Sequence, residues 1–84
     1  MSDSSLKIRL QYFASLRERR GLSREELVTT AGTPAGLYEE LSGRHGFVLP
    51  VARLRVAVNG EFAGLDQPLR DGDEVAFIPP VAGG

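Results

Sequence analysis

Residues 71–84 read DGDEVAFIPPVAGG, and this stretch carries the strongest structural signals in the chain. An Asp-Gly turn comes first, and the apolar segment from Glu74 to Ile78 that follows it predicts a buried strand. Pro79 and Pro80 then end the strand, because proline has no N–H to give to a sheet and favours an extended exit. The stretch therefore predicts a last strand that leads directly into an extended C-terminal tail.

The segments before this strand predict further strands. Residues 6–13 (LKIRLQYF) and 54–60 (LRVAVNG) alternate apolar and polar side chains, which is typical of half-buried strands. Residues 24–31 are a weaker strand candidate, and residues 61–64 form a short one. Residues 14–23 are polar and contain a glycine, so we expect a hairpin loop there, with room for a helical turn.

One helix is expected between the second and third strands. Thr33 followed by Pro34 is a typical helix start, and Gly43 or Gly46 can end it. The order strand, strand, helix, strand, short strand, strand fits an α+β fold of the ubiquitin-like β-grasp type, with a mixed sheet and one main helix packed on one face. We expect a flexible N-terminus at residues 1–5, the β-grasp domain at 6–78 and an extended functional tail at 79–84.

Composition excludes several classes of function. The 84 residues include no cysteine and a single histidine, His45, so we expect no metal site, no bound cofactor and no side-chain nucleophile or base of the usual kinds. The chain shows neither an apolar run of membrane-spanning length nor a signal peptide, and its basic residues form no concentrated patch for nucleic acid. We therefore expect a cytoplasmic protein with no membrane or nucleic-acid partner.

Charge is distributed unevenly along the chain. Residues 1–59 hold nine basic and six acidic residues, whereas residues 60–84 hold one basic and five acidic residues. By electrostatic complementarity, the acidic C-terminal segment predicts a basic surface on a protein partner near the tail.

Some apolar residues fall on the outward side of the predicted strands. In a β-grasp fold the first, third and last strands are neighbours, so these residues are expected to gather on the solvent side of the sheet. An exposed apolar patch usually marks a protein interface. The expected members are Phe13, Ala57, Ala76 and Ile78, with Phe62 at the rim.

The tail brings one reactive group to a partner, the terminal carboxylate of Gly84. Gly83 and Gly84 lack Cβ atoms and fit a narrow channel, and the two prolines keep the approach extended. A carboxylate becomes reactive once ATP converts it to an acyl-adenylate, and a sulfur nucleophile can then displace AMP to leave a thiocarboxylate. This route would let a protein without cysteine carry sulfur.

The same C-terminal stretch closely resembles that of MoaD, the small subunit of molybdopterin synthase. Further similarities are YFASLRE from Tyr12, AVNGE from Ala57 and DQPLRDGDEV from Asp66, so the resemblance covers nearly the whole chain from Leu6. Two departures are Ala82, where threonine is common in the family, and Ile78 in place of an aromatic residue.

The resemblance implies a sulfur carrier for molybdenum cofactor biosynthesis. A ubiquitin-activating-like enzyme would adenylate Gly84 with ATP, and a sulfur donor protein would convert it to the thiocarboxylate. The large subunit of molybdopterin synthase would then receive the tail in a heterotetramer and use the sulfur to build the dithiolene on cyclic pyranopterin monophosphate. The catalytic side chains would belong to the large subunit. The implied tail-insertion residues are Pro79, Pro80, Val81, Ala82 and Gly83, and the implied interface residues are Phe13, Phe62 and Ile78.

Three alternatives remain open at this point. A ThiS-like carrier for thiazole synthesis shares the fold, the activation and the Gly-Gly end. A ubiquitin-like modifier would use the same activated carboxyl group to form isopeptide bonds with lysines of target proteins. A plain interaction domain with an inert tail would be unaffected by deletion of Gly83 and Gly84.

Overall fold

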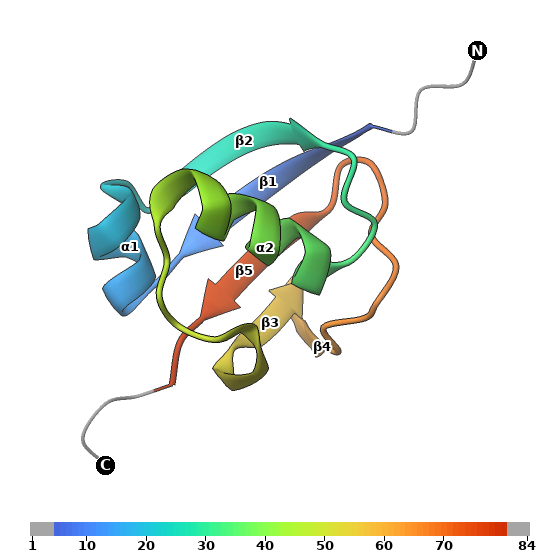
Figure 1. Ribbon diagram of the computed structural model, residues 1–84. Coiled ribbons are helices and arrows are strands. Elements are labelled where there is room, and N and C mark those ends of the chain that lie inside the picture. The colour runs from blue at the N-terminus through green and yellow to red at the C-terminus, as the bar shows by residue number, and fades with distance from the viewer. Residues whose placement is uncertain (1–4, 81–84) are drawn as a thin grey trace.

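Five strands form one mixed sheet in the computed structural model, which describes residues 5–80 (Figure 1). Their order across the sheet is β2-β1-β5-β3-β4, so the last strand of the chain lies in the middle. The elements are, in chain order, β1 (Leu6–Tyr12), α1 (Ala14–Arg20), β2 (Arg24–Thr29), α2 (Pro34–His45), the 3-10 helix η1 (Val51–Arg53), β3 (Arg55–Val58), β4 (Glu61–Ala63) and β5 (Glu74–Ile78).

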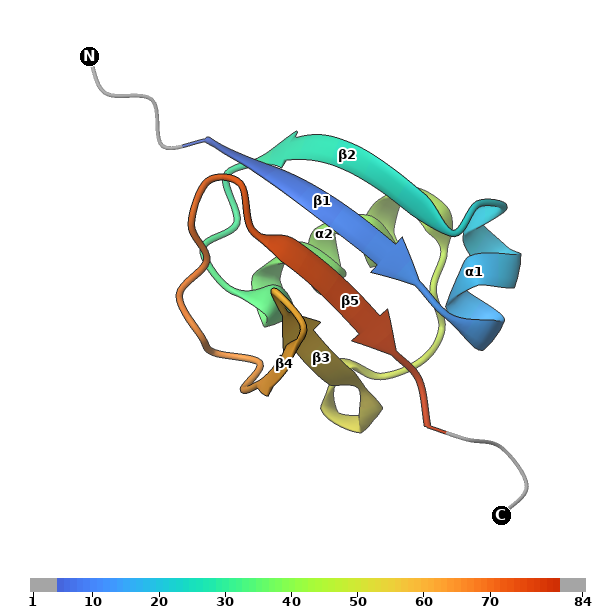
Figure 2. The ribbon, with the colours of Figure 1, turned by 180° about the vertical axis from the view of Figure 1, so that it is seen from behind.

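The central strand β5 joins the two halves of the sheet. It pairs in parallel with β1 and antiparallel with β3. The chain runs from β1 to β5 by way of α2, which covers one face of the sheet, and Figure 2 shows the opposite face with no helix over its strands. This arrangement confirms the predicted α+β fold of the β-grasp type, including the neighbouring first, third and last strands.

The alternation in the sequence matches the burial of the strands. Ile8 and Leu10 of β1 are buried beneath α2, whereas the alternating residues Lys7 and Arg9 are exposed. Each large apolar side chain removed from water contributes about 1.5–3 kcal/mol, so this inward face supplies much of the stability. The core combines side chains of three strands and of one face of α2: Ile8, Leu10, Tyr12, Leu37, Tyr38, Leu41, Val56, Val58, Val75 and Phe77.

α2 begins at the predicted residue. The side chain of Thr33 accepts a hydrogen bond from the backbone N–H of Gly36 at 3.2 Å, and Pro34 occupies the first turn. Of the two glycines predicted as helix ends, Gly46 is the one used, and its φ of 71° lies in the left-handed region that glycine adopts without strain. Gly43 stays inside the helix.

The prediction of a hairpin loop over residues 14–23 is corrected by the structure. Most of this segment forms α1, a helix of seven residues that ends at Gly21. Leu16 is the one buried residue of α1, and a single apolar residue gives no helical period in the sequence. The short helix η1 was not predicted either, and β2 ends at Thr29, two residues earlier than expected.

A polar cluster ties α1 to the sheet where β1 ends. The buried hydroxyl of Tyr12 donates to Glu25 Oε2 at 2.5 Å. Arg20, at the end of α1, donates to both oxygens of the same carboxylate, from Nε at 3.0 Å and from a terminal nitrogen at 2.8 Å. The cluster therefore joins β1, α1 and β2. Among residues 5–80 no buried side-chain nitrogen or oxygen lacks a hydrogen-bond partner.

The cluster makes the charged state of Glu25 part of the fold. Hydrogen bonds from Arg20 first, and from Tyr12, hold the pKa of the Glu25 carboxyl below its usual range against the opposing effect of burial. The pKa of Tyr12 is raised, chiefly because burial disfavours the phenolate. A carboxyl group whose pKa is lower in the folded than in the unfolded chain stabilises the fold at pH values above its unfolded pKa of about 4.3. This stabilisation is lost as the pH falls through the pKa of the folded state.

Tyr12→Phe should lower the free energy of unfolding by about 1.5–3 kcal/mol at pH 7, the range for a hydrogen bond to a charged group. The loss should shrink below about pH 4, because protonated Glu25 accepts a weaker hydrogen bond than the carboxylate. Urea unfolding followed by circular dichroism at several pH values measures both effects.

Tyr38→Phe is the matched control, because the Tyr38 hydroxyl donates at 2.8 Å to a neutral acceptor, the carbonyl of Leu49. Its loss should be about 0.5–1.5 kcal/mol and the same at each pH. If the Tyr12→Phe loss is equally independent of pH, the proposed contribution of the Glu25 carboxylate is wrong.

Candidate functional site

The chain leaves the sheet at the end of its central strand. β5 ends at Ile78, Pro79 is buried against the fold and Pro80 is exposed. Neither proline has an N–H, so pairing with the neighbouring strands stops here. α1 and η1 lie on either side of this exit (Figure 1, Figure 2). Outside the described residues lie the other members of the predicted tail, whose roles stay predictions: Val81, Ala82, Gly83 and Gly84.

The register of the sheet brings the predicted interface residues together beside this exit. Phe62 in β4 lies opposite Ala57 in β3, and Ala57 lies opposite Ala76 in β5. Neighbouring strands are about 4.8 Å apart, so these three side chains form a row across three strands. Ile78 follows two positions after Ala76, on the same face of β5.

Phe13 completes the group at the neighbouring strand. Tyr12 pairs with Phe77, so Phe13 and Ile78 are the next residues at the same end of β1 and β5. Phe13 also precedes α1 as its N-cap, and its carbonyl accepts the backbone N–H of Leu16 at 3.1 Å. Its position is thus set by the strand on one side and by the helix on the other.

These five residues, Phe13, Ala57, Phe62, Ala76 and Ile78, are called the apolar patch below. Phe62 is 71% exposed and Phe13 is 36% exposed, while the other three are half-buried. Ala57 lies beside Phe62 and Ala76 lies one strand farther on, and these two small side chains make a shallow floor next to the exposed aromatic residue. An exposed aromatic residue next to a shallow apolar floor is typical of a protein interface.

The turn after Phe13 is strained. Ala14 has a φ of 50°, in the left-handed region that costs a residue with a Cβ roughly 1–2 kcal/mol. The connection between β1 and α1 is therefore held in one conformation by its surroundings. Backbone strain of this kind often accompanies functional positions.

The sequence-based expectation of an acidic surface at the tail is wrong. Asp71 and Asp73 precede β5, and Glu61 begins β4, so all three lie at the opposite end of the sheet from Ile78. The backbone N–H of Lys7, near the start of β1, donates to the Asp71 carboxylate at 2.6 Å. Closeness in sequence to the C-terminus therefore does not place these acidic groups at the exit.

Sequence reasoning missed the polar border of the apolar patch. Gln11 in β1 lies opposite Ala76 and continues the row toward β2, where Arg24 lies opposite Gln11. On the other side, Arg55 in β3 lies opposite Ile78. The alternation of β1 and β3 already places Gln11 and Arg55 on the outward face. What the sequence lacked was the register, which decides which outward residues are neighbours across strands.

The described residues include no group of three His, Cys, Asp or Glu side chains placed to hold a metal ion. No helix in residues 5–80 is long and apolar enough to cross a bilayer. His45 is the last residue of α2, and its ring lies 5.8 Å from the ring of Phe47.

Comparison with known proteins gives extensive matches. Residues 10–84 match the ThiS family. The molybdopterin synthase sulfur carrier subunit of Escherichia coli (strain K12) is 39% identical over 80 residues, which cover 92% of this chain and 99% of that protein. The protein of the same name from Mycobacterium tuberculosis is 40% identical over 82 residues, which cover 94% of this chain and 99% of that protein.

Solved structures show the same fold. The putative subunit 1 of molybdopterin converting factor from Pyrococcus furiosus has a TM-score of 0.76 and 35% identity, and the match covers 90% of this chain and 99% of that one. Small archaeal modifier protein 1 of Haloferax volcanii has a TM-score of 0.73 and 28% identity, over 90% and 99%.

A third structure contains a partner. In the complex of subunits 1 and 2 of molybdopterin-converting factor from Helicobacter pylori, the matching chain has a TM-score of 0.61 and 25% identity, over 94% of this chain and 100% of that one. The family match, the two relatives and these structures agree with the fold, and they show that the chain belongs to the ThiS family, as a MoaD-type ubiquitin-like sulfur carrier.

Proposed function

We propose that this chain carries sulfur on its C-terminal Gly84 and donates it to cyclic pyranopterin monophosphate, where it forms the dithiolene of molybdopterin. The observation that carries the proposal is the position of the apolar patch beside the end of the central strand, at Ile78 and the two prolines. A partner that binds the patch thereby also receives the chain that leads to Gly84.

The chemistry starts at the terminal carboxylate. One oxygen attacks the α-phosphate of ATP, so that pyrophosphate leaves and an acyl-adenylate forms. Sulfide sulfur from a donor protein then displaces AMP and leaves the thiocarboxylate. The thiocarboxylate sulfur forms a C–S bond to the pterin, and water then cleaves the acyl C–S bond of the resulting thioester, which leaves the sulfur on the pterin and restores the carboxylate of Gly84. Two such transfers supply the two sulfurs of the dithiolene, and each spent carrier can be activated again.

Two kinds of partner follow from this cycle. An adenylating enzyme related to ubiquitin-activating enzymes would bind ATP and the tail, and the large subunit of molybdopterin synthase would bind the charged carrier in a heterotetramer. The Helicobacter pylori complex of the two subunits supports the second partner. In this proposal the large subunit supplies the acid–base side chains, and the cycle takes place in the cytoplasm, where ATP is available.

A second candidate is a ubiquitin-like modifier of other proteins. The likeness to small archaeal modifier protein 1, with a TM-score of 0.73, favours it. Both functions need the same activated carboxyl group and differ in the acceptor, which is sulfur for the carrier and a lysine amine for the modifier. A thiazole-forming carrier differs from our proposal only in the molecule that receives the sulfur.

Intact mass after incubation with ATP, a sulfide source and extract of the host cell separates a sulfur carrier from a modifier of other proteins. A sulfur carrier gains the mass difference of one oxygen replaced by sulfur, and fragmentation assigns the gain to the Gly84 peptide. A modifier gives conjugates of higher mass instead. An unchanged mass, while a known family member gains sulfur in the same extract, would contradict both.

Gly84→Ala should slow thiocarboxylate formation at least about fivefold, because a methyl group forced into a fitted channel costs about 1–3 kcal/mol. Gly43→Ala is the matched control, since a Cβ at Gly43 meets no atom within 4 Å. The initial rate of the mass gain measures both variants. Equal rates of the two variants would mean that the C-terminus does not enter a narrow channel of the activating enzyme.

Phe62→Asp should weaken binding to the large subunit at least about tenfold, since it replaces the most exposed aromatic residue of the apolar patch with a charge. Val28→Asp is the control, because Val28 is 59% exposed in the edge strand β2, opposite Lys7 and away from the patch. Titration calorimetry with the large subunit of the same host gives both affinities. Equal affinities of the two variants would refute the assignment of the patch as the docking surface.

A further inference from the structure

Two exposed arginines border the apolar patch on opposite sides. Arg24 in β2 lies opposite Gln11, which is itself opposite Ala76, and Arg55 in β3 lies opposite Ile78. With strands about 4.8 Å apart, Arg24 stands two strands from β5 on one side and Arg55 stands one strand away on the other. The chain leaves the sheet between them.

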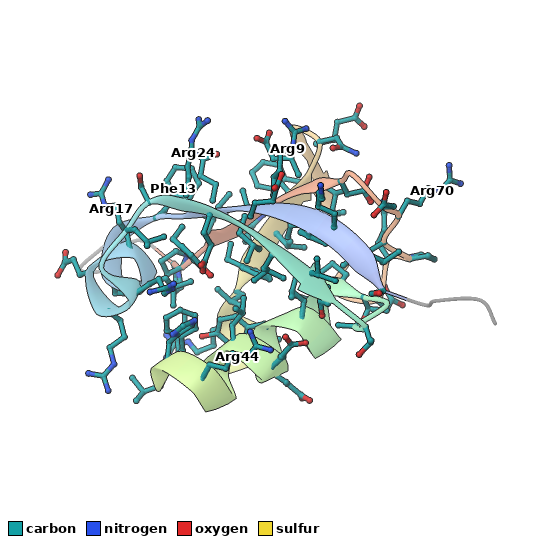
Figure 3. All side chains as sticks on the ribbon, turned by 90° about the horizontal axis from the view of Figure 1, so that it is seen from above. Arg9, Phe13, Arg17, Arg24, Arg44 and Arg70 are labelled. Carbon is teal, nitrogen blue, oxygen red and sulfur yellow. The ribbon has the colours of Figure 1, made fainter. Side chains whose placement is uncertain are left out.

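The labelled side chains of Figure 3 show how the charges are arranged. Arg24 lies near Phe13 and Arg17, at the end of the sheet where α1 begins, and it points away from α2. Arg70 lies at the opposite end of the molecule. The surface around the exit is therefore basic, and the acidic turn with Asp71 and Asp73 lies far from it.

Neither bordering arginine is neutralised within the described residues. The ion pairs there use other arginines, namely Arg20 with Glu25 and Arg44 with Glu40. In residues 5–80 no carboxylate lies within 4 Å of the side-chain nitrogens of Arg24 or Arg55.

Arg9, on the same face, differs from these two arginines. It forms no ion pair in residues 5–80 either, but it lies directly opposite Glu26 on one side and Glu74 on the other, so an acidic residue flanks it on each neighbouring strand. Arg24 shares a shallow hollow with Glu26 and Glu74, but neither carboxylate forms an ion pair with it in residues 5–80, so its guanidinium group remains available to a partner.

A partner that covers the patch must accommodate these two charges. Burial of the patch removes water from around the neighbouring guanidinium groups, and a charge that loses water is costly unless it gains an opposite charge. Guanidinium binds a carboxylate through two parallel hydrogen bonds, which fixes direction as well as distance. Carboxylates are therefore the groups that the partner surface needs at both borders.

We infer that Arg24 and Arg55 bind carboxylates of the partner protein on the two sides of the apolar patch. The partner thus presents an acidic rim around an apolar centre, and the two contacts orient it so that the mouth of its channel faces the exit at Pro80. This inference rests on the proposed docking through the patch and adds the chemistry and the orientation of the partner. It also reverses the sign of the partner charge expected from the sequence.

The test compares three charge reversals that change the net charge equally: Arg24→Glu, Arg55→Glu and the control Arg70→Glu. Arg70 is exposed and forms no ion pair within residues 5–80, so its reversal reports only the overall charge of the carrier. The binding constant of each variant for the host's large subunit is measured at about 0.1 M and about 1 M salt, where the Debye length is about 10 Å and about 3 Å. Circular dichroism confirms that each variant is folded.

Arg24→Glu and Arg55→Glu should each raise Kd at least about fivefold at the lower salt concentration, mostly through a slower association rate. The effect should fall below about twofold at the higher salt concentration. Arg70→Glu should change Kd less than about twofold at both. The neutral variants Arg24→Gln and Arg55→Gln should lie between the native chain and the reversals.

Two results would overturn the inference. If the reversals at Arg24 and Arg55 weaken binding no more than Arg70→Glu, while Phe62→Asp still weakens it, the patch docks but the partner has no acidic rim. If either reversal tightens binding, the partner surface is basic. A normal affinity of Phe62→Asp would instead refute the proposed docking itself, which separates the two failures.

Discussion

The pairing of β5 with both β1 and β3 is the interaction on which the rest of the structure depends. It joins the N-terminal hairpin to the C-terminal strands, and it buries Val75 and Phe77 under α2. The same pairing positions Ala76 and Ile78 on the outward face and directs the chain out of the middle of the sheet. β5 therefore contributes to the core with its inward residues, to the apolar patch with its outward residues, and to the exit of the chain with its C-terminal end.

The apolar patch depends on support from behind. Tyr12 is buried directly before Phe13, and its hydroxyl is tied through Glu25 to Arg20 at the end of α1. The turn between β1 and α1, with its strained Ala14, is thereby held from two sides. A surface that is ordered before binding loses less conformational freedom when a partner covers it. In the proposed cycle, such order would favour docking on the activating enzyme and on the large subunit in turn.

The sequence was sufficient for the fold class because strand alternation and helix capping are local signals. The alternation of apolar and polar residues predicts that Leu10, Val56 and Phe77 lie on the buried face of the sheet. Thr33 and Pro34 predict the start of α2. α1 was missed because its stability comes from one buried side chain, Leu16, and from contacts outside its own segment. The composition of the patch could be predicted, whereas its charged border could not, because cross-strand neighbours such as Arg55 and Ile78 are set by register.

The position of Lys7 limits how two copies of this chain can be joined by an isopeptide bond. Lys7 is the only lysine of the chain, and it lies near the start of β1, at the end of the sheet opposite the exit. In the proposed cycle, an acyl-adenylate at Gly84 would react with amines but not with the protonated guanidinium groups near the exit, so these arginines would attract a partner without reacting with the activated carboxyl group. Any isopeptide bond between two copies of this chain has one possible acceptor side chain, and a single peptide containing Lys7 would report it.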